Sequence, residues 1–258
     1  YPVARISTIL SLAKPALVLS DDSHRELLPA RYAAQALPWR TLLGAVPLDP
    51  ICTPAAPGEA MYMLFTSGST GTPKGVVGTW LTAQNRTDWA ARAYPLGADD
   101  CCAIRTPLNF VDSLWEILDP LLATSSCVIV PTATLVDSRR LVPMMVHHGV
   151  RRMVVVPSLI RSWLRDAADL LPSWRSLNLL LSSAEVPDPA DVAALQKAMP
   201  GLCFVNCYGS SEVADVTAYL WPSPPSAGDE AVLGKPLPGN SIVLLDKWGQ
   251  VVAPGNSG

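Results

Sequence analysis

The chain has 258 residues, of which 49% are hydrophobic and 16% charged, and its formal net charge is −3. This length allows a sizeable core and one or two domains. The sequence contains no uninterrupted run of about 18 apolar residues and no stripe of Lys and Arg, so we expect neither a membrane span nor a nucleic-acid partner.

Apolar strand-like runs alternate with helix-like runs through most of the chain. The predicted helices cover residues 4–13, 22–34, 79–95, 113–124, 137–148, 157–170 and 188–199. The predicted strands cover residues 16–20, 61–67, 101–106, 127–131, 151–156, 177–182, 202–206 and 216–221, and a hairpin is predicted at 241–254. This alternation favours an α/β fold, in which a largely parallel sheet carries helices on both faces and a β-hairpin lies near the C-terminus.

The six cysteines form no CxxC pair, and most of them lie in apolar stretches. We interpret them as buried, reduced thiols of a cytoplasmic protein rather than as disulfides or zinc ligands. His147 and His148 have no neighbouring cluster of Cys, Asp or Glu, which indicates an exposed helix end. The chain starts at Tyr1 without Met and ends at Gly258 just after the predicted hairpin, so we expect a segment of a longer protein.

The strongest local signal is the stretch YMLFTSGSTGTPKGVV at residues 62–77. An apolar strand leads directly into a loop of Gly, Ser and Thr that also holds one lysine. Glycines allow a tight loop with inward N–H groups, and hydroxyls and a lysine suit the oxygens of a polyphosphate. The loop is not a Walker A motif, because two residues separate Gly71 from Lys74 and Gly75 follows. A flexible linker is the alternative, but the loop is short and adjoins a strongly apolar strand.

The stretch FTSGSTGTPKG resembles the signature of the adenylate-forming superfamily, which comprises acyl-CoA synthetases, luciferases and the adenylation domains of non-ribosomal peptide synthetases. Other segments resemble further family motifs in the same order, namely YPVARI at 1–6, NFVDSLWEI at 109–117, LLLSSAEV at 179–186, NCYGSSEV at 206–213 and LGKPLPG at 233–239. The resemblance covers nearly the whole chain and is closest to the peptide-synthetase branch.

The resemblance implies a partial adenylation domain, a layered α/β fragment of the family's large N-terminal domain that is truncated at both ends. Residues of roughly 1–60 and 206–258 are expected in one sheet subdomain and residues 61–205 in the other. The family's small C-terminal lid domain, its ribose-binding aspartate and its adenylation lysine are expected beyond Gly258. This segment alone should therefore be a poor catalyst.

The resemblance also implies a two-step reaction. ATP, with Mg²⁺, and a carboxylate give an acyl-adenylate and pyrophosphate. The acyl group then passes to the thiol of phosphopantetheine, either on a carrier-protein domain of the same chain or on CoA. Such chemistry consists mostly of positioning and of charge neutralisation on phosphates.

Site residues follow from the matched motifs. By resemblance, the ATP phosphates would be bound by Thr66, Ser67, Gly68, Ser69, Thr70, Gly71 and Lys74. The adenine would be bound by Ser183, Ala184, Glu185, Asn206, Tyr208 and Gly209. Catalytic roles are implied for Lys74, Ser211 and Glu212. Glu212 would also help to hold Mg²⁺, which prefers one or two carboxylates plus phosphate oxygens. The sequence departs from the family at Ser210-Ser211, where Pro-Thr is usual, and at Ala184, where glycine is usual.

The segment FVDSLWEI at 110–117 bears on the substrate. In relatives that activate α-amino acids, an aspartate directly after the phenylalanine pairs with the α-ammonium group. Val111 stands at that position, and Asp112 follows one residue later. Because a β-ammonium group lies one carbon further from the carboxylate, the displaced acid favours a small β-amino acid such as β-alanine, as in Ebony-like relatives. The other residues that match the family's pocket are Trp115, Val154, Leu181, Ser183, Cys207, Asp215 and Val216.

Several alternatives stay open. Asp112 stands near a helix start and could be an N-cap, although Ser113 and Glu116 could form a capping box without it. Trp115 and Cys207 could be core residues. An acyl-CoA ligase for an uncharged carboxylate, and a nucleotide-binding pseudo-enzyme or interaction domain, are the alternative functions.

Overall fold

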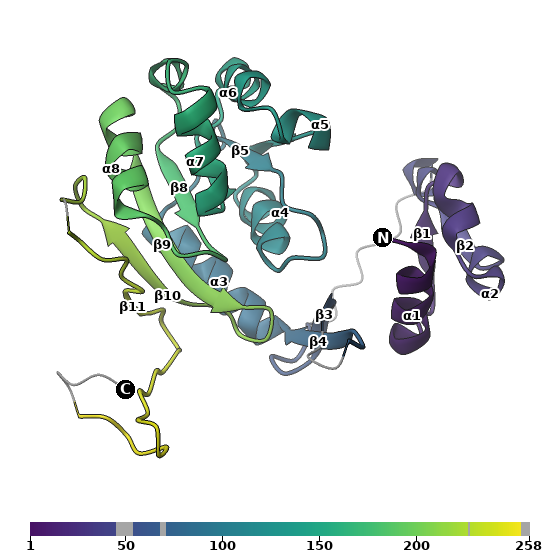
Figure 1. Ribbon diagram of the computed structural model, residues 1–258. Helices are drawn as coiled ribbons and strands as arrows, with labels where there is room; N and C mark the ends of the chain where they lie inside the picture. The colour runs from purple at the N-terminus through teal and green to yellow at the C-terminus, as the bar shows by residue number, and fades with distance from the viewer. Residues whose placement is uncertain (45–53, 68–70, 227, 254–258) are drawn as a thin grey trace. The chain divides into compact units, whose positions relative to one another are not determined.

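The computed structural model describes residues 1–44, 54–67, 71–226 and 228–253 (Figure 1). The chain divides into two compact units, Tyr1–Trp80 and Leu81–Gly258. Among the described residues, no helix has both the length and the apolar character needed to cross a membrane.

The first unit contains short helices and two small two-stranded sheets. Its elements are α1 (Val3–Ala13), β1 (Val18–Ser20), η1 (Asp22–Leu27), α2 (Ala30–Ala33), β2 (Ala36–Pro38), η2 (Trp39–Gly44), β3 (Ala60–Thr66) and β4 (Lys74–Thr79). β1 and β2 are parallel, and β3 and β4 form an antiparallel hairpin. The continuous helix predicted at 22–34 is wrong, because Pro29 separates η1 from α2. Proline has no N–H group and favours the extended conformation that Leu28 adopts before it.

The second unit is built on a seven-stranded sheet with the order β11-β10-β9-β8-β7-β5-β6. The strands are β5 (Cys101–Ile104), β6 (Ser126–Ile129), β7 (Arg152–Val155), β8 (Leu179–Ser182), β9 (Cys203–Ser210), β10 (Ala214–Trp221) and β11 (Lys235–Pro236). The strands from β5 to β9 pair in parallel, and β10 and β11 add antiparallel pairs. This sheet confirms the predicted α/β class.

Helices cover both faces of this sheet. They are α3 (Trp80–Ala93), α4 (Asp112–Leu122), α5 (Thr132–Leu135), α6 (Ser138–His147), α7 (Pro157–Asp166), η3 (Leu171–Ser173) and α8 (Pro189–Ala198). Val155 and Phe204 pack in a large apolar cluster with residues of α6, α7 and α8. Val154 and Leu181 pack with Trp89 of α3 on the opposite face, since successive strand residues point in opposite directions. Figure 1 shows α6–α8 on one face and α3 and α4 on the other.

β9 pairs with β8 in parallel, with Ser182 opposite Asn206. The segment that begins at Asn206 therefore continues the sheet of β5–β8. The expected division of the chain between two sheet subdomains stays a prediction. The predicted C-terminal hairpin is reduced, within the described residues, to one bridge between Leu245 and Val251. Its turn is closed by the Asp246 carboxylate, which accepts hydrogen bonds from two backbone N–H groups.

The cysteines and histidines mostly follow their predictions. Three buried free thiols agree with the expectation, those of Cys101, Cys102 and Cys207. Cys127 is exposed instead, because β6 is an edge strand, and Cys52 lies outside the described residues. His147 and His148 are exposed at the end of α6, as predicted.

Candidate active site

The predicted phosphate-binding loop connects β3 and β4 in the first unit. Thr66 ends β3 and pairs with Lys74, the first residue of β4. Ser67, Gly71 and Lys74 are exposed. Gly71 has a φ of +80°, which L side chains rarely adopt. Three further predicted phosphate-binding residues lie outside the described part of the chain: Gly68, Ser69 and Thr70. The phosphate-binding role of this loop stays a prediction.

In the second unit, the carboxyl ends of β7 and β8 lie beside Asn206 of β9, because Val155 is in register with Ser182 and Ser182 with Asn206. β9 continues beyond this level to Ser210. Two residues of the predicted site follow these strand ends: Ser183 directly after β8, and Tyr208 in the part of β9 that extends beyond them. Ligands of open α/β sheets bind beyond such strand ends, so this edge is the candidate site of the second unit.

Asp112 is the first residue of α4, and its carboxylate reaches the loop after β8. Asp112 Oδ2 accepts a hydrogen bond of 2.6 Å from Ser183 Oγ. Asp112 is half-buried and Ser183 is buried. The N-cap position of α4 belongs to Val111. The N-cap alternative for Asp112 is therefore wrong, and its side chain is directed to the strand ends.

The capping box predicted for Ser113 and Glu116 is also wrong. Ser113 Oγ donates to the carbonyl of Phe110 at 2.7 Å. The Glu116 carboxylate accepts from the backbone N–H groups of Arg105 and Thr106, both at 2.8 Å, and from Thr106 Oγ1 at 2.8 Å. The Glu116 carboxylate thus binds three donors that follow β5 and not the backbone N–H groups at the start of α4. Buried N–H groups need acceptors, and Glu116 supplies them here.

The surroundings of Asp112 raise its pKa. Burial is the largest cause, and the carboxylate of Asp215 adds to it. The hydrogen bond from Ser183 and the more distant guanidinium groups of Arg86 and Arg105 act in the opposite direction, but they do not outweigh burial. A carboxylate in this environment gains free energy from a cation placed directly opposite it.

Arg86 of α3 is the centre of a buried charge network. Its Nε lies 2.5 Å from Asp215 Oδ2, and its Nη1 lies 3.9 Å from Asp119 Oδ2. The guanidinium carbon lies 4.8 Å from the centroid of the Trp89 ring and 5.3 Å from that of Trp115. Burial alone would lower the pKa of Arg86, but the two carboxylates outweigh it and the pKa is raised. The charge of Asp215, an acid expected to face the substrate, is therefore matched from within the protein.

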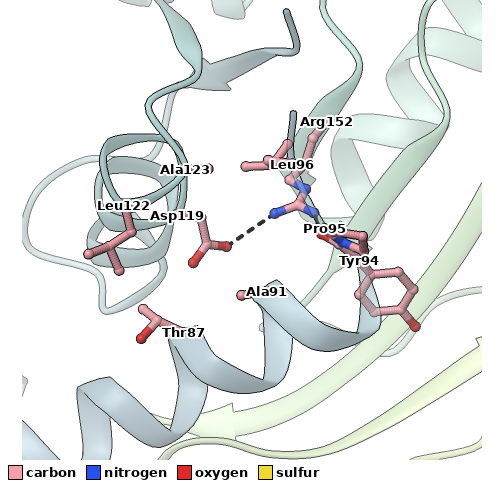
Figure 2. Close-up of a pocket in the computed structure, with 9 residues that line it drawn as sticks. All are labelled: Thr87, Ala91, Tyr94, Pro95, Leu96, Asp119, Leu122, Ala123 and Arg152. Carbon is pink, nitrogen blue, oxygen red and sulfur yellow. Dashed lines mark hydrogen bonds and ion pairs between the residues drawn. The ribbon is translucent and has the colours of Figure 1, made fainter. Parts of the chain in front are cut away.

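Arg152 extends this network to a small cavity. Arg152 Nη1 lies 3.5 Å from Asp119 Oδ2, and its Nη2 donates to the carbonyl of Tyr94. Figure 2 shows the Asp119–Arg152 pair beside a cavity of about 220 Å³. Burial lowers the pKa of Arg152 and raises that of Asp119. Because Arg152 is the first residue of β7, this cavity lies at the end of the strand opposite to the candidate site.

The predicted apolar pocket residues divide by burial. Four of them are buried: Trp115, Val154, Leu181 and Cys207. The last three belong to one apolar cluster, whereas Trp115 lies against Arg86. Val111 and Val216 are half-buried. The contribution of these residues to a substrate pocket stays a prediction.

The residues expected to bind adenine have distinct local roles. Glu185 accepts hydrogen bonds from the backbone N–H and the hydroxyl of Ser158, both at 2.9 Å, and so stabilises the start of α7. Asn206 donates to the carbonyl of Val232 at 2.9 Å. Tyr208 is 51% exposed, so its ring is accessible to a planar group.

Two backbone positions near these residues are constrained. Ala184 has a φ of +68°, a conformation in which glycine is not strained. The left-handed backbone conformation at this position therefore explains why glycine is usual in the resembled motif. Gly209 pairs with Asp215 across β9 and β10, and a Cβ atom there would collide with the carbonyl of Ala214. Glycine at this position permits the close approach of the two strands.

The turn between β9 and β10 borders a larger cavity. Ser211 is half-buried and Glu212 is exposed in this turn. The cavity has a volume of about 760 Å³, which is in the range of small-molecule sites. Its lining includes Asn85, Glu212, Asp215, Val216 and Asn240. The role of Glu212 in holding Mg²⁺ stays a prediction.

Arg86 was not among the site residues predicted from the sequence. Arg86 shares the buried face of α3 with Ala83, Thr87 and Ala90. A charge on an apolar helix face is visible from the helical spacing, so this signal was available. Its partner Asp215 lies 129 residues away in the sequence, and no local pattern connects the two.

The sheet, its helices and the charged residues at its strand ends define an α/β ligand-binding protein. The family model described as AMP-binding enzyme matches residues 1–258, and the chain belongs to this family. The chain is 32% identical, over 95% of its length, to the beta-alanyl-bioamine nonribosomal peptide synthetase ebony of Drosophila melanogaster, of which it covers 30%. It is 29% identical, over 97% of its length, to the L-proline--[L-prolyl-carrier protein] ligase of Streptomyces coelicolor, of which it covers 52%.

A solved structure agrees with the observed fold. The crystal structure of IdnL1 matches 99% of this chain with a TM-score of 0.81 and 27% sequence identity, and the match covers 53% of that protein. The chain thus spans only part of these relatives.

Proposed function

We propose that the chain is the adenylate-forming part of an enzyme that activates a small β-amino acid, such as β-alanine, and passes it to a phosphopantetheine thiol. In the first step, a carboxylate oxygen of the acid bonds to the α-phosphorus of ATP, and the bond to pyrophosphate breaks. In the second step, the thiolate sulfur bonds to the acyl carbon, and AMP leaves. Family membership and the ligase and synthetase names of the relatives support this reaction.

The observation that carries the substrate proposal is the carboxylate of Asp112. It is half-buried at the strand ends and accepts a hydrogen bond from Ser183. Two guanidinium groups act on it from a distance, but Arg86 pairs with Asp215 and Arg105 lies 4.0 Å from Glu116. The negative charge of Asp112 is therefore available to a substrate ammonium group.

The apolar neighbour of Asp112 supports a β- rather than an α-amino acid. Val111 is half-buried and offers no charge to an α-ammonium group. The acid that follows it stands one residue further along the segment, which suits an ammonium group one carbon further from the reacting carboxylate. The name of the Drosophila relative, which includes beta-alanyl, is consistent with this substrate class.

The remaining residues would act on the nucleotide. Lys74, with the hydroxyls of Thr66 and Ser67, would bind the phosphates, and Tyr208 would stack on the adenine. Ser211 would hydrogen-bond the α-phosphate. Mg²⁺, held by Glu212 and phosphate oxygens, would neutralise charge on the phosphates. The protein's own contribution is to hold the acid and the α-phosphate in a reactive geometry.

A second candidate is a ligase for an uncharged acid. Burial raises the pKa of Asp112, which favours a protonated carboxyl that no longer attracts a cation. The two candidates differ in the ionisation state of one side chain and therefore in substrate preference.

ATP–pyrophosphate exchange by the full-length natural protein distinguishes the two candidates. Three acids form a matched set: β-alanine, L-alanine, which carries the amine one carbon closer, and propionate, which lacks it. The proposal predicts the highest kcat/KM for β-alanine, by about 100-fold over propionate, because a substrate without the ammonium group leaves the Asp112 carboxylate unpaired, which costs several kcal/mol. A kcat/KM for propionate equal to or above that for β-alanine would contradict it.

A further inference from the structure

We infer that Arg86 is a positioning residue that determines substrate specificity: by pairing with Asp215, it leaves the Asp112 carboxylate at the strand ends as the partner of a substrate ammonium group. This inference rests on the proposed activation of a β-amino acid and deepens it. Arg86 acts through Asp215 and not through contact with the substrate.

The position of Arg86 is fixed by more than its closest partner. The side chains of Arg86 and Asp215 are 2% and 5% exposed, and their contact is 2.5 Å long. Asp119 and the rings of Trp89 and Trp115 hold the same guanidinium group from other directions. Removal of the Asp215 charge would therefore leave a cation in place rather than release a flexible side chain.

The balance of charges around Asp112 depends on this pair. The ionisable groups that act on Asp112 come from four places in the fold: Asp215 of β10, Arg86 of α3, Arg105 after β5 and the Cys207 thiol of β9. Burial raises the pKa of Cys207 well above its ordinary value, so the thiol carries no charge at neutral pH.

Three of these groups are charged and have an ion-pair partner. Arg86 matches Asp215, and Arg105 lies within ion-pair distance of Glu116. Within the described part of the chain, Asp112 therefore supplies one unmatched negative charge to the candidate site.

An unpaired Asp215 would add a second negative charge to the candidate site. It lines the cavity of about 760 Å³ together with Val216. Without the Arg86 charge, the site would present two carboxylates and would accept a substrate with two ammonium groups. With Arg86 in place, the charge of Asp215 is already matched, and a second ammonium group beside Asp215 is repelled by the guanidinium group. The structure thus predicts a preference for β-alanine over 2,3-diaminopropionate, which is β-alanine with a second amine.

A series of variants in the full-length natural protein tests this role. Asp215→Asn removes a negative charge and leaves Arg86 unpaired. Arg86→Gln removes a positive charge and leaves Asp215 unpaired. The double variant removes both charges, so the net charge of the site is that of the wild type. Asp169→Asn, at the exposed Arg139–Asp169 pair, is the control for a change of the same type elsewhere. The measurements are kcat/KM for β-alanine, propionate and 2,3-diaminopropionate, and the pH at which kcat/KM for β-alanine falls on the acid side.

The two single variants should change kcat/KM for different substrates. Asp215→Asn should lower kcat/KM for β-alanine by about tenfold or more with little change for propionate. It should also move the acid limb to lower pH, since Asp215 no longer offsets the effect of Arg86 on Asp112. Arg86→Gln should reduce the discrimination against 2,3-diaminopropionate by about tenfold or more. The double variant should return the β-alanine value to within about threefold of wild type.

Equal losses for all three acids, with no recovery in the double variant, would show that the Arg86–Asp215 pair is only structural and would overturn the inference. If Arg86→Gln does not fold, the single variant Asp215→Asn and its acid limb still decide, because a shift to higher pH or no shift contradicts the inference. Failure of the proposed function has a different signature, since wild-type protein would then not prefer β-alanine to propionate.

Discussion

The substitution Asp112→Asn should make the protein more stable at neutral pH. Asparagine has the same shape and keeps an oxygen that accepts the hydrogen bond from Ser183 Oγ, so the change removes mainly the charge. Burial and Asp215 raise the pKa of Asp112 in the folded state above its unfolded value. The folded state therefore binds the Asp112 proton more tightly than the unfolded state does. Its carboxylate opposes folding once the pH exceeds the folded-state pKa.

The expected gain is modest. Replacement of buried ionic groups by uncharged ones of similar volume is often neutral or stabilises proteins by roughly 1–4 kcal/mol. Asp112 is half-buried, and its charged hydrogen bond with Ser183 is about 1 kcal/mol stronger than the neutral one that replaces it. These values leave a net gain of about 1–2 kcal/mol, or a rise in Tm of roughly 2–8 °C for a domain of this size.

Urea unfolding and thermal melts at about pH 7.5 and about pH 4 measure this gain and its pH dependence. The variant should exceed wild type at the higher pH, and the difference should shrink at the lower pH as Asp112 becomes protonated in both states. Asp169→Asn is the matched control, because Asp169 is exposed and paired with Arg139 at 2.8 Å, and its loss should bring no gain. A variant that is less stable than wild type at the higher pH would refute the reasoning, since Asp112 would then be compensated by cations of the protein and not be available to a substrate.

Three further substitutions test the local structure of the site. Gly209→Ala should destabilise the protein by about 1–3 kcal/mol in urea unfolding, because the new Cβ would collide with the carbonyl of Ala214; an unchanged midpoint would contradict this. Ala184→Gly should raise stability by about 0.5–1 kcal/mol, since it relieves a left-handed conformation that costs alanine roughly 1–2 kcal/mol while adding backbone freedom to the unfolded chain; a loss in Tm would argue against the assigned strain. Burial raises the pKa of Glu116 as it does that of Asp112, but Glu116→Gln should still lower stability by about 1–3 kcal/mol, because both carboxylate oxygens accept hydrogen bonds from Arg105 and Thr106 and glutamine keeps only one acceptor oxygen; retention of the wild-type Tm would show that these bonds contribute little.

The elements of the sheet could be predicted because their signals are local. The apolar strands β5 and β7 to β9 and the helices between them follow from hydrophobic runs and spacing, and parallel pairing follows from their alternation. The helix expected at 22–34 failed because a local proline effect at Pro29 outweighs the periodic pattern.

The site was predicted less completely, because its contacts join distant parts of the chain. Asp112 stood out as a charge within an apolar segment, and the structure places it against Ser183. The pattern of Ser113 and Glu116 matched a capping box equally well. The structure assigns Glu116 to the strand end after β5 instead, and only the fold brings those donors within reach. The partner of Arg86 was invisible for the same reason.

In the proposed reaction, the Asp112 carboxylate binds the ammonium group of the substrate. ATP–pyrophosphate exchange by wild-type and Asp112→Asn full-length protein, with β-alanine and propionate as paired substrates, tests this role. The substitution should lower kcat/KM for β-alanine by about 100-fold or more and change the value for propionate by less than about threefold, because only the ammonium group loses its partner. Equal losses for both acids, or an unchanged preference for β-alanine, would show that Asp112 does not bind the ammonium group.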